Sequence, residues 1–382
     1  MWYLQIDTLL ILLGIALVFG FLSLSKRYTG ILRILPIVSI AFLCYVSWTL
    51  AVFYVLYVLM TWIFALLLRR IKRGRKFCFF ILSIGCCLPL IYLRFAPQLS
   101  LPTIACIGLA YNMLKAIDLL YYEYYSGEKA NFEIYTNYML FLPVITAGPV
   151  FRYRDFVRTW KKPVALTLPR FTDAVKRIIL GLFQKVVLSA TALQILNSLA
   201  QGYWRWFEIT AVPFVSLAVL FFDMAGYASI AIGLGSMMGI SVPENFKKPF
   251  RSASFTQFWR NWHVTVSDWI REHVFILFSA KKLNKWQGAL ISIIVLVLMG
   301  IWHDFTWLFF VDGILLGLIL AVENVFSLSN VNQRKVSKWY FEMRCAIVIV
   351  LFALNSMIFT LTTAQISEIF SSFLQMIGGV LG

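Results

Sequence analysis

The sequence predicts an all-α polytopic integral membrane protein. Hydrophobic residues make up 61% of the 382 residues and charged residues only 13%, whereas a soluble domain carries about 25% charged residues. Apolar stretches recur along the whole chain, each near the roughly 20 residues that a helix needs to cross a bilayer. A soluble globular enzyme is therefore excluded, because lipid rather than water must solvate the outside of this chain.

The apolar stretches give the expected membrane segments in order. They lie at 8–24, 31–50, 51–68, 77–96, 101–121, 135–151, 176–200, 208–235, 287–303, 305–326 and 342–362. We expect about ten or eleven membrane helices in one membrane domain over residues 1–382. The first stretch is followed, not preceded, by basic residues, which is typical of a first membrane span rather than a cleaved signal peptide.

The net charge of +17 is concentrated in short basic clusters beside apolar stretches. These clusters lie at 26–27, 69–76, 152–162, 281–285 and 334–338. An excess of Lys and Arg is typical of cytoplasmic loops, and the same loops could also dock an acidic soluble partner. Nucleic-acid binding is not expected, because no folded polar domain remains to present such a surface.

One apolar stretch, 135–151, is expected to be re-entrant or interfacial. A full crossing there would place the basic cluster 152–162 outside the cell, against the orientation that the other clusters indicate. Pro143 and the Ala-Gly-Pro sequence at 147–149 interrupt a helix. Membrane proteins tolerate such breaks only where the freed backbone is buried in protein or lines a water-filled cavity.

The most polar long segment, 241–288, is expected to contain an amphipathic helix in or dipping into the interface. Its apolar side chains recur at intervals of three and four: Phe255, Phe258, Trp259, Trp262, Val266, Trp269, Ile270 and Val274. The other face carries Gln257, Arg260, Asn261, Asp268, Arg271 and Glu272. The glycine-containing stretch at 233–239 does not have dinucleotide-binding spacing, so we expect its small residues to permit close helix packing.

Candidate chemistry is concentrated in three histidines, His263, His273 and His303. His303 closes an apolar run between Trp302 and Asp304, and a desolvated neutral imidazole suits a general base. The alternative is a hydrogen-bonded structural histidine. His263 borders the apolar stripe and could face headgroups or a protein interior, whereas we expect His273 to be solvated or snorkelling.

Other chemistries have little support. There is no HExxH motif, paired Cys/His spacing or carboxylate cluster, so no metal site is expected. Six cysteines show no pairing pattern, and we interpret them as small membrane hydrophobes. Asp118, Asp223 and Tyr227 could line an ion path in a transporter, or each could pair with a nearby cation or backbone group.

Four motifs, in order, carry a resemblance to a known family. They are AGPVFRYRDF (147–156), FFDMAGYASIAIGLGSMMGISVPENFKKPF (221–250), FWRNWHVTVSDWIREHVFI (258–276) and MGIWHDFTW (299–307). The chain resembles the membrane-bound O-acyltransferase (MBOAT) family over about 147–326. The short length and the segment IGLAYNMLKAIDLLYYEYYSG (107–127) resemble the DltB-like branch of teichoic acid D-alanyl transfer, which we favour. AGPVFRYRDF and PENF resemble the polysaccharide O-acetyltransferases related to AlgI.

The resemblance implies a set of site residues. The catalytic histidine of the family falls on His303 and its supporting histidine on His263. Asp304 stands where relatives usually have glycine, and an adjacent carboxylate could tune or orient the imidazole. The expected substrate-binding residues are Trp302, Asn261, Trp262 and Asp304.

The resemblance also implies a reaction and its partners. The helices would surround a central funnel or tunnel in a bacterial cell membrane, with no bound cofactor. The donor would be a D-alanyl thioester on the phosphopantetheine arm of a small acidic carrier protein, arriving from the cytoplasm. An acceptor or relay protein would approach from outside. A transporter or flippase of envelope precursors and a non-catalytic scaffold are the alternatives from other classes.

Overall fold

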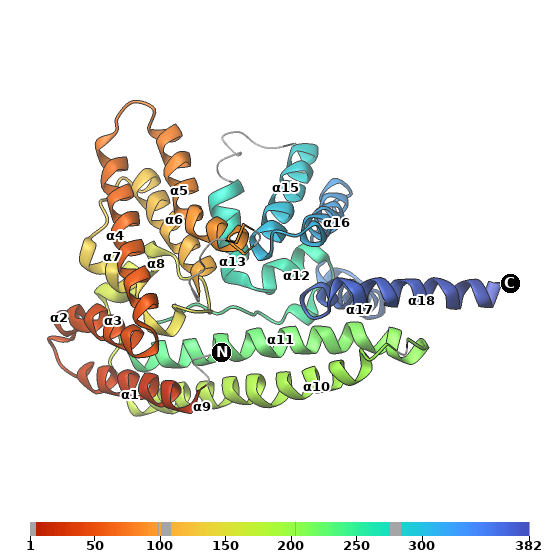
Figure 1. Ribbon diagram of the computed structural model, residues 1–382, viewed down its shortest axis with the longest axis horizontal. Helices are drawn as coiled ribbons and strands as arrows, with labels where there is room; N and C mark the ends of the chain where they lie inside the picture. The colour runs from red at the N-terminus through yellow and green to blue at the C-terminus, as the bar shows by residue number, and fades with distance from the viewer. Residues whose placement is uncertain (1–4, 98, 101–107, 203, 276–283, 382) are drawn as a thin grey trace. The chain divides into compact units, whose positions relative to one another are not determined.

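The computed structural model describes residues 5–97, 99–100, 108–202, 204–275 and 284–381, and these residues contain no β-strand. The all-α membrane fold is thus confirmed (Figure 1). Two predicted segments, 101–121 and 241–288, lie partly outside the described residues. The residues outside include Cys106, Lys281 and Lys282.

The structure is a succession of helices along the chain. Up to the middle of the chain they are α1 (Ile6–Leu22), α2 (Tyr28–Ile31), α3 (Leu35–Val46), α4 (Trp48–Arg70), α5 (Arg75–Phe95), α6 (Leu109–Tyr125), α7 (Phe132–Met139), α8 (Tyr153–Lys161) and α9 (Leu168–Leu182). A π-helical segment, Phe183–Ser189, joins α9 to α10 (Ala190–Leu199). The rest are α11 (Trp206–Met237), α12 (Phe255–Asn261), α13 (Val264–Ile270), α15 (Lys285–His303), α16 (Trp307–Val325), α17 (Lys338–Ser356) and α18 (Thr363–Leu381).

Eight helices in the described part of the chain are long and apolar enough to cross a membrane. They are 28–46, α4, α5, 168–199, α11, α15, α16 and 338–359. The sequence predicted about ten or eleven; the difference lies in stretches that form shorter or broken helices. The helix α1 has 17 residues, and α6 also has 17 and carries Lys115, Asp118 and Glu123. The protein is therefore a multi-pass membrane protein.

The stretch 135–151 forms no spanning helix, as predicted. The helix α7 ends at Met139, and a single 3₁₀ turn, Leu142–Val144, follows. Polar side chains of α6 bond the interrupted backbone: Asn112 donates to the Ile145 carbonyl at 2.7 Å and Lys115 to the Met139 carbonyl at 3.1 Å. The freed backbone is thus satisfied inside protein, which is the condition for such a break at membrane depth.

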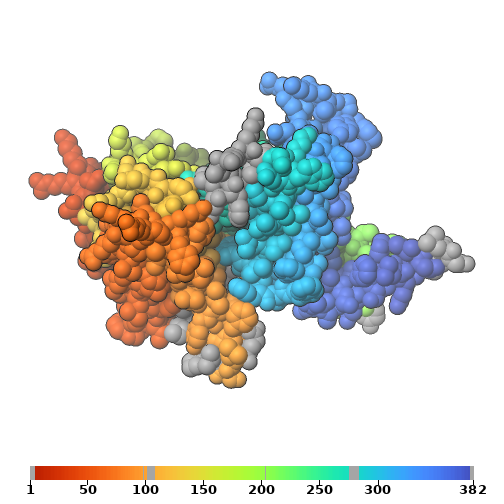
Figure 2. Space-filling view, turned by 90° about the horizontal axis from the view of Figure 1, so that it is seen from above, coloured from red at the N-terminus to blue at the C-terminus, as the bar shows by residue number. Residues whose placement is uncertain are grey.

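The chain divides into two compact units, which are described separately. The first comprises residues 1–179 and 228–244, and the second comprises 180–227 and 245–382. The single membrane domain over 1–382 and the central funnel stay predictions. In the second unit, α18 packs through Ile369 against Leu196 and Met357, and Figure 2 shows it, in dark blue, projecting from its unit. Its exposed Phe370 and Leu374 suit a lipid surrounding.

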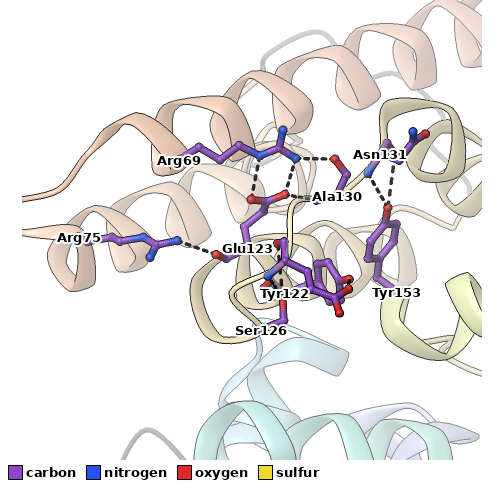
Figure 3. Close-up of polar contacts among 9 residues, drawn as sticks. Arg69, Arg75, Tyr122, Glu123, Ser126, Ala130, Asn131 and Tyr153 are labelled. Carbon is purple, nitrogen blue, oxygen red and sulfur yellow. Dashed lines mark hydrogen bonds and ion pairs between the residues drawn. The ribbon is translucent and has the colours of Figure 1, made fainter.

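A polar network in the first unit joins α4, α5 and α6 beside the basic cluster 69–76 (Figure 3). Arg69 bonds the buried Glu123 carboxylate, at 2.8 Å from Nε to Oε2, and also donates to the Ala130 carbonyl. Arg75 donates to the Glu123 carbonyl at 2.6 Å. Two basic residues of the cluster are therefore structural. The remaining ones are exposed: Arg70, Lys72, Arg73 and Lys76.

The second unit has an aromatic core that fixes the segment between α11 and α15. Phe258 and Trp262 pack on Phe352 of α17, with ring centroids 4.3 Å and 4.7 Å apart. The buried Glu323 carboxylate of α16 accepts the backbone N–H groups of Phe255 and Thr256 at 2.7 Å and 2.8 Å. An anionic group at a helix N-terminus stabilises it, so α12 is held in place from both ends.

Candidate active site

His303 lies at the last residue of α15 inside an aromatic cage. Its ring centroid is 4.8 Å from that of Trp302, 6.2 Å from Phe309 and 5.1 Å from Phe359. Phe309 and Phe359 also contact each other edge to face at 5.1 Å. Residues of α15, α16 and the turn after α17 thus contact the imidazole. These rings cover one side of the imidazole, which is only partly buried at the end of a membrane helix.

Two features fix this cage. One helical turn from Phe309 and Phe359, the buried Asp312 of α16 accepts a hydrogen bond from the amide of Asn355 of α17. At Gly300, a Cβ would lie 2.2 Å from the Phe309 carbonyl oxygen. Only glycine allows α15 and α16 to approach this closely, so the position of His303 depends on Gly300.

His263 lies at the break between α12 and α13. The sequence predicted one amphipathic helix, but the structure divides it, because His263 adopts a left-handed backbone with φ 45°. The side chain is only 1% exposed, so of the two alternatives the protein interior is correct. Its Nδ1 lies 3.1 Å from Oδ1 of the buried Asn245.

The two histidines are electrostatic neighbours within the second unit. In the sequence, His263 lies in the segment between the spanning helices α11 and α15. Burial of the side chain lowers its pKa to about 3, and repulsion from His303 when both rings are charged contributes. His263 is therefore neutral at physiological pH.

The other predicted site residues have structural contacts. Trp262 belongs to the aromatic core, stacked on Phe258 at 5.4 Å. The Asn261 amide donates to the Ser252 hydroxyl at 3.1 Å. The carboxylate of Asp304 accepts the N–H of the next residue at 3.0 Å, and Trp302 forms one wall of the His303 cage. Substrate binding by Trp302, Asn261, Trp262 and Asp304 stays a prediction.

The expectation of a solvated His273 was wrong. His273 is buried, its Nδ1 lies 2.8 Å from the Trp269 carbonyl oxygen, and its ring stacks on the Trp269 indole at 4.1 Å. It lies in a π-helical turn, Arg271–Phe275. A π turn contains an extra residue and changes the direction of the side chains that follow, which a regular helical period does not predict.

The acidic residues within apolar helices are paired, as the structural alternative predicted. Asp118 accepts from the Tyr153 backbone N–H, and from the Tyr138 hydroxyl at 3.4 Å. Asp223 of α11 forms an ion pair with the buried Lys185, which also lies over the Tyr227 ring at 5.9 Å. These contacts explain why Asp118, Asp223 and Tyr227 occur within apolar helices, and no ion path is needed to explain them.

The structure shows no metal site in the residues that it describes. Among them, no group of three His, Cys, Asp or Glu side chains lies close enough to hold an ion.

The sequence analysis did not identify three residues near the two histidines: Asn245, Phe309 and Phe359. Asn245 stands within PENF, a motif that carried the resemblance. Phe359 gave no signal, because it reaches His303 only through the packing of α17.

Comparison with known proteins decides the family. A family model described as "MBOAT, membrane-bound O-acyltransferase family" matches residues 21–362. The chain belongs to this family. It is an acyltransferase by membership, and its family motifs bring His303 and His263 into one unit.

Curated relatives include D-alanyltransferases and O-acetylases. The chain is 30% identical over 340 residues to a teichoic acid D-alanyltransferase of Streptococcus thermophilus, covering 82% of this chain and 81% of that protein. Identity to the teichoic acid D-alanyltransferase of Bacillus subtilis is 30%, over 71% of this chain and 73% of that protein. A probable alginate O-acetylase AlgI of Pseudomonas putida is 30% identical over 63% of this chain, but the match spans only 50% of that protein.

We predict that the Gly300→Ala variant lowers acyl transfer about 10- to 100-fold if His303 has the catalytic role that the family resemblance implies, because a small displacement of such a group carries a cost of that size. The added methyl group would force α15 away from the Phe309 carbonyl and move His303. Turnover of purified protein measures this effect. Gly14→Ala is the matched control, since a Cβ at Gly14 meets no atom within 4 Å; equal losses in both variants would contradict the packing argument.

Proposed function

We propose that this protein transfers a D-alanyl group from a carrier-protein thioester to a hydroxyl group of a cell-envelope acceptor, as in teichoic acid D-alanylation. The observation that carries the proposal is the match to a teichoic acid D-alanyltransferase over 82% of this chain and 81% of the relative. The alginate O-acetylases match over a smaller part of both chains. O-acetylation of an envelope polysaccharide is therefore the second candidate, favoured by that shared segment.

The reaction needs a base and little water. His303 would remove the proton of the acceptor hydroxyl as its oxygen attacks the thioester carbonyl carbon. The new C–O bond forms, the C–S bond breaks, and the proton passes from His303 to the departing thiolate. The aromatic cage of Trp302, Phe309 and Phe359 would limit competing hydrolysis of the thioester.

The exposed basic residues suit the proposed carrier. Arg69 and Arg75 are bonded within the network around Glu123 (Figure 3). The remaining exposed cations of the cluster form the carrier-docking loop in this proposal: Arg70, Lys72, Arg73 and Lys76. A cytoplasmic loop of this charge attracts an acidic protein over several ångströms and accelerates its association. The phosphopantetheine thioester would thus be supplied by the carrier, not bound permanently.

The donor is tested with the purified protein in proteoliposomes. We expect label transfer from a D-alanyl-loaded acidic carrier protein to a polyol-phosphate acceptor, and none from an acetyl donor. Transfer from the acetyl donor alone would overturn D-alanyl transfer in favour of O-acetylation.

The docking loop is tested by charge reversal. The Arg70→Glu/Lys72→Glu variant should raise the KM for the loaded carrier about tenfold with little change in kcat, and should reduce its salt dependence, because surface charges act mainly on association. The control, Lys26→Glu/Arg27→Glu, carries the same charge change in another exposed cluster. An equal KM change in both variants would mean that net charge, not this loop, attracts the carrier.

A further inference from the structure

Asn245 is fixed against the segment that carries His263. Residues 245–247 run beside 261–264, and two backbone hydrogen bonds join them: Lys247 N–H to the Asn261 carbonyl and Val264 N–H to the Asn245 carbonyl, each at 2.9 Å. The Phe246 ring packs edge to face on Trp262 at 5.1 Å. The side chain of Asn245 is therefore held by backbone on both sides, and it is 1% exposed.

The amide oxygen of Asn245 determines the protonation of His263. The Thr265 hydroxyl donates to Oδ1 at 2.8 Å, and His263 Nδ1 lies 3.1 Å from the same oxygen. An amide oxygen has no proton to donate, so with the amide oriented as in this structure we infer that His263 Nδ1 carries the proton. In a neutral imidazole the other nitrogen, Nε2, then has only a lone pair and accepts hydrogen bonds.

We propose that Asn245 is a positioning residue of the acyl-transfer site: its amide oxygen holds His263 as the neutral, Nδ1-protonated imidazole, so that Nε2 serves as a fixed hydrogen-bond acceptor. In that state His263 can receive a hydrogen bond from the acceptor hydroxyl or from His303, and it cannot act as a general acid. The catalytic importance of this arrangement rests on the proposed function, whereas the tautomer itself does not.

A second observation concerns the amide nitrogen of Asn245. Its Nδ2 is buried and has no hydrogen-bond partner among the described residues. A buried donor left unsatisfied costs about 1–3 kcal/mol, and such orphan donors in native proteins call for an explanation. This N–H is therefore available to an oxygen atom bound next to His263.

The tautomer can be measured directly, because the chain has only three histidines. Protein labelled with ¹⁵N-histidine in lipid nanodiscs should give three pairs of imidazole ¹⁵N signals, one pair for each histidine, assigned with His263→Gln and His303→Gln variants. We expect the His263 signals to show Nδ1–H and an unprotonated Nε2, unchanged between pH 5 and pH 8. A charged His263 in this range, or an Nε2–H tautomer, would overturn the proposal whatever the enzyme's activity.

Two variants of Asn245 test the consequence for turnover. Asn245→Asp keeps the acceptor oxygen and adds a negative charge, so it should retain the tautomer, raise the pKa of His263 and move the acid limb of the pH–kcat profile to higher pH. Asn245→Ala removes the acceptor and should lower kcat about 10- to 100-fold, with less effect on the KM for the carrier.

The matched control is Asn332→Ala, which removes an exposed asparagine cap from the loop before α17. A purely structural role for Asn245 would lower protein yield and thermal stability in both Asn245 variants without moving the pH profile of Asn245→Asp, and this outcome would overturn the proposal. If the NMR result is as expected but wild-type protein transfers no acyl group, the proposed function fails while the assigned tautomer stands.

Discussion

His303→Ala should leave the protein folded and inserted in the membrane while lowering acyl transfer about 10²- to 10⁴-fold, the usual contribution of a general base. His303 is the histidine at the centre of the aromatic cage. His263 is a poor replacement base, because burial alone already lowers its pKa. The measurement is single-turnover transfer from the loaded donor by purified protein in lipid.

The matched control for this variant is His273→Gln. His273 is also a buried histidine stacked on an aromatic ring, but it has no role in the proposed reaction. We expect His273→Gln to retain transfer within about threefold, whereas His303→Gln, which keeps polarity without a base, should be as inactive as His303→Ala. Near-normal transfer by His303→Ala would refute the catalytic assignment and favour a non-catalytic scaffold.

Hydropathy predicted the class of the fold well because the bilayer sets a length for each apolar helix. The break at 135–151 was predicted from the positions of the basic clusters and from Pro143, since proline cannot continue a helix without leaving backbone groups unsatisfied. In the described residues, eight helices have the length and hydropathy of a span, against the ten or eleven segments expected, because hydropathy alone does not separate a spanning helix from a 17-residue helix such as α6 with its buried Lys115, Asp118 and Glu123.

The sequence identified the candidate histidines but not the geometry around them. Helical periodicity assumes a regular backbone, so it could show neither the left-handed His263 nor the π turn that buries His273. The contact between Asn245 and His263 joins two loops, and Phe359 reaches His303 through tertiary packing. Contacts of this kind depend on how separate helices pack, which no local pattern encodes.

The Asp223→Asn variant should destabilise the protein by about 3–5 kcal/mol, the usual cost of removing one partner from a buried ion pair. The side chain of Lys185 is only 3% exposed, against 33% for Asp223, so removing the carboxylate leaves an uncompensated buried cation. A Cβ at Gly226 would lie 2.7 Å from Lys185 Cβ. The two helices therefore pack closely at the root of the lysine side chain. The measurement is the free energy of unfolding in mixed micelles.

The double variant Lys185→Met/Asp223→Asn distinguishes a structural role of Asp223 from a role in ion transport. It removes both charges at similar volume, and such replacements of buried pairs are often neutral, so stability and acyl transfer should recover toward wild type. The control, Glu342→Gln, breaks the exposed pair with Arg251 and should cost less than about 1 kcal/mol. A transporter that used Asp223 as an ion site would stay inactive in the double variant however stable it became, and that result would restore the transport hypothesis.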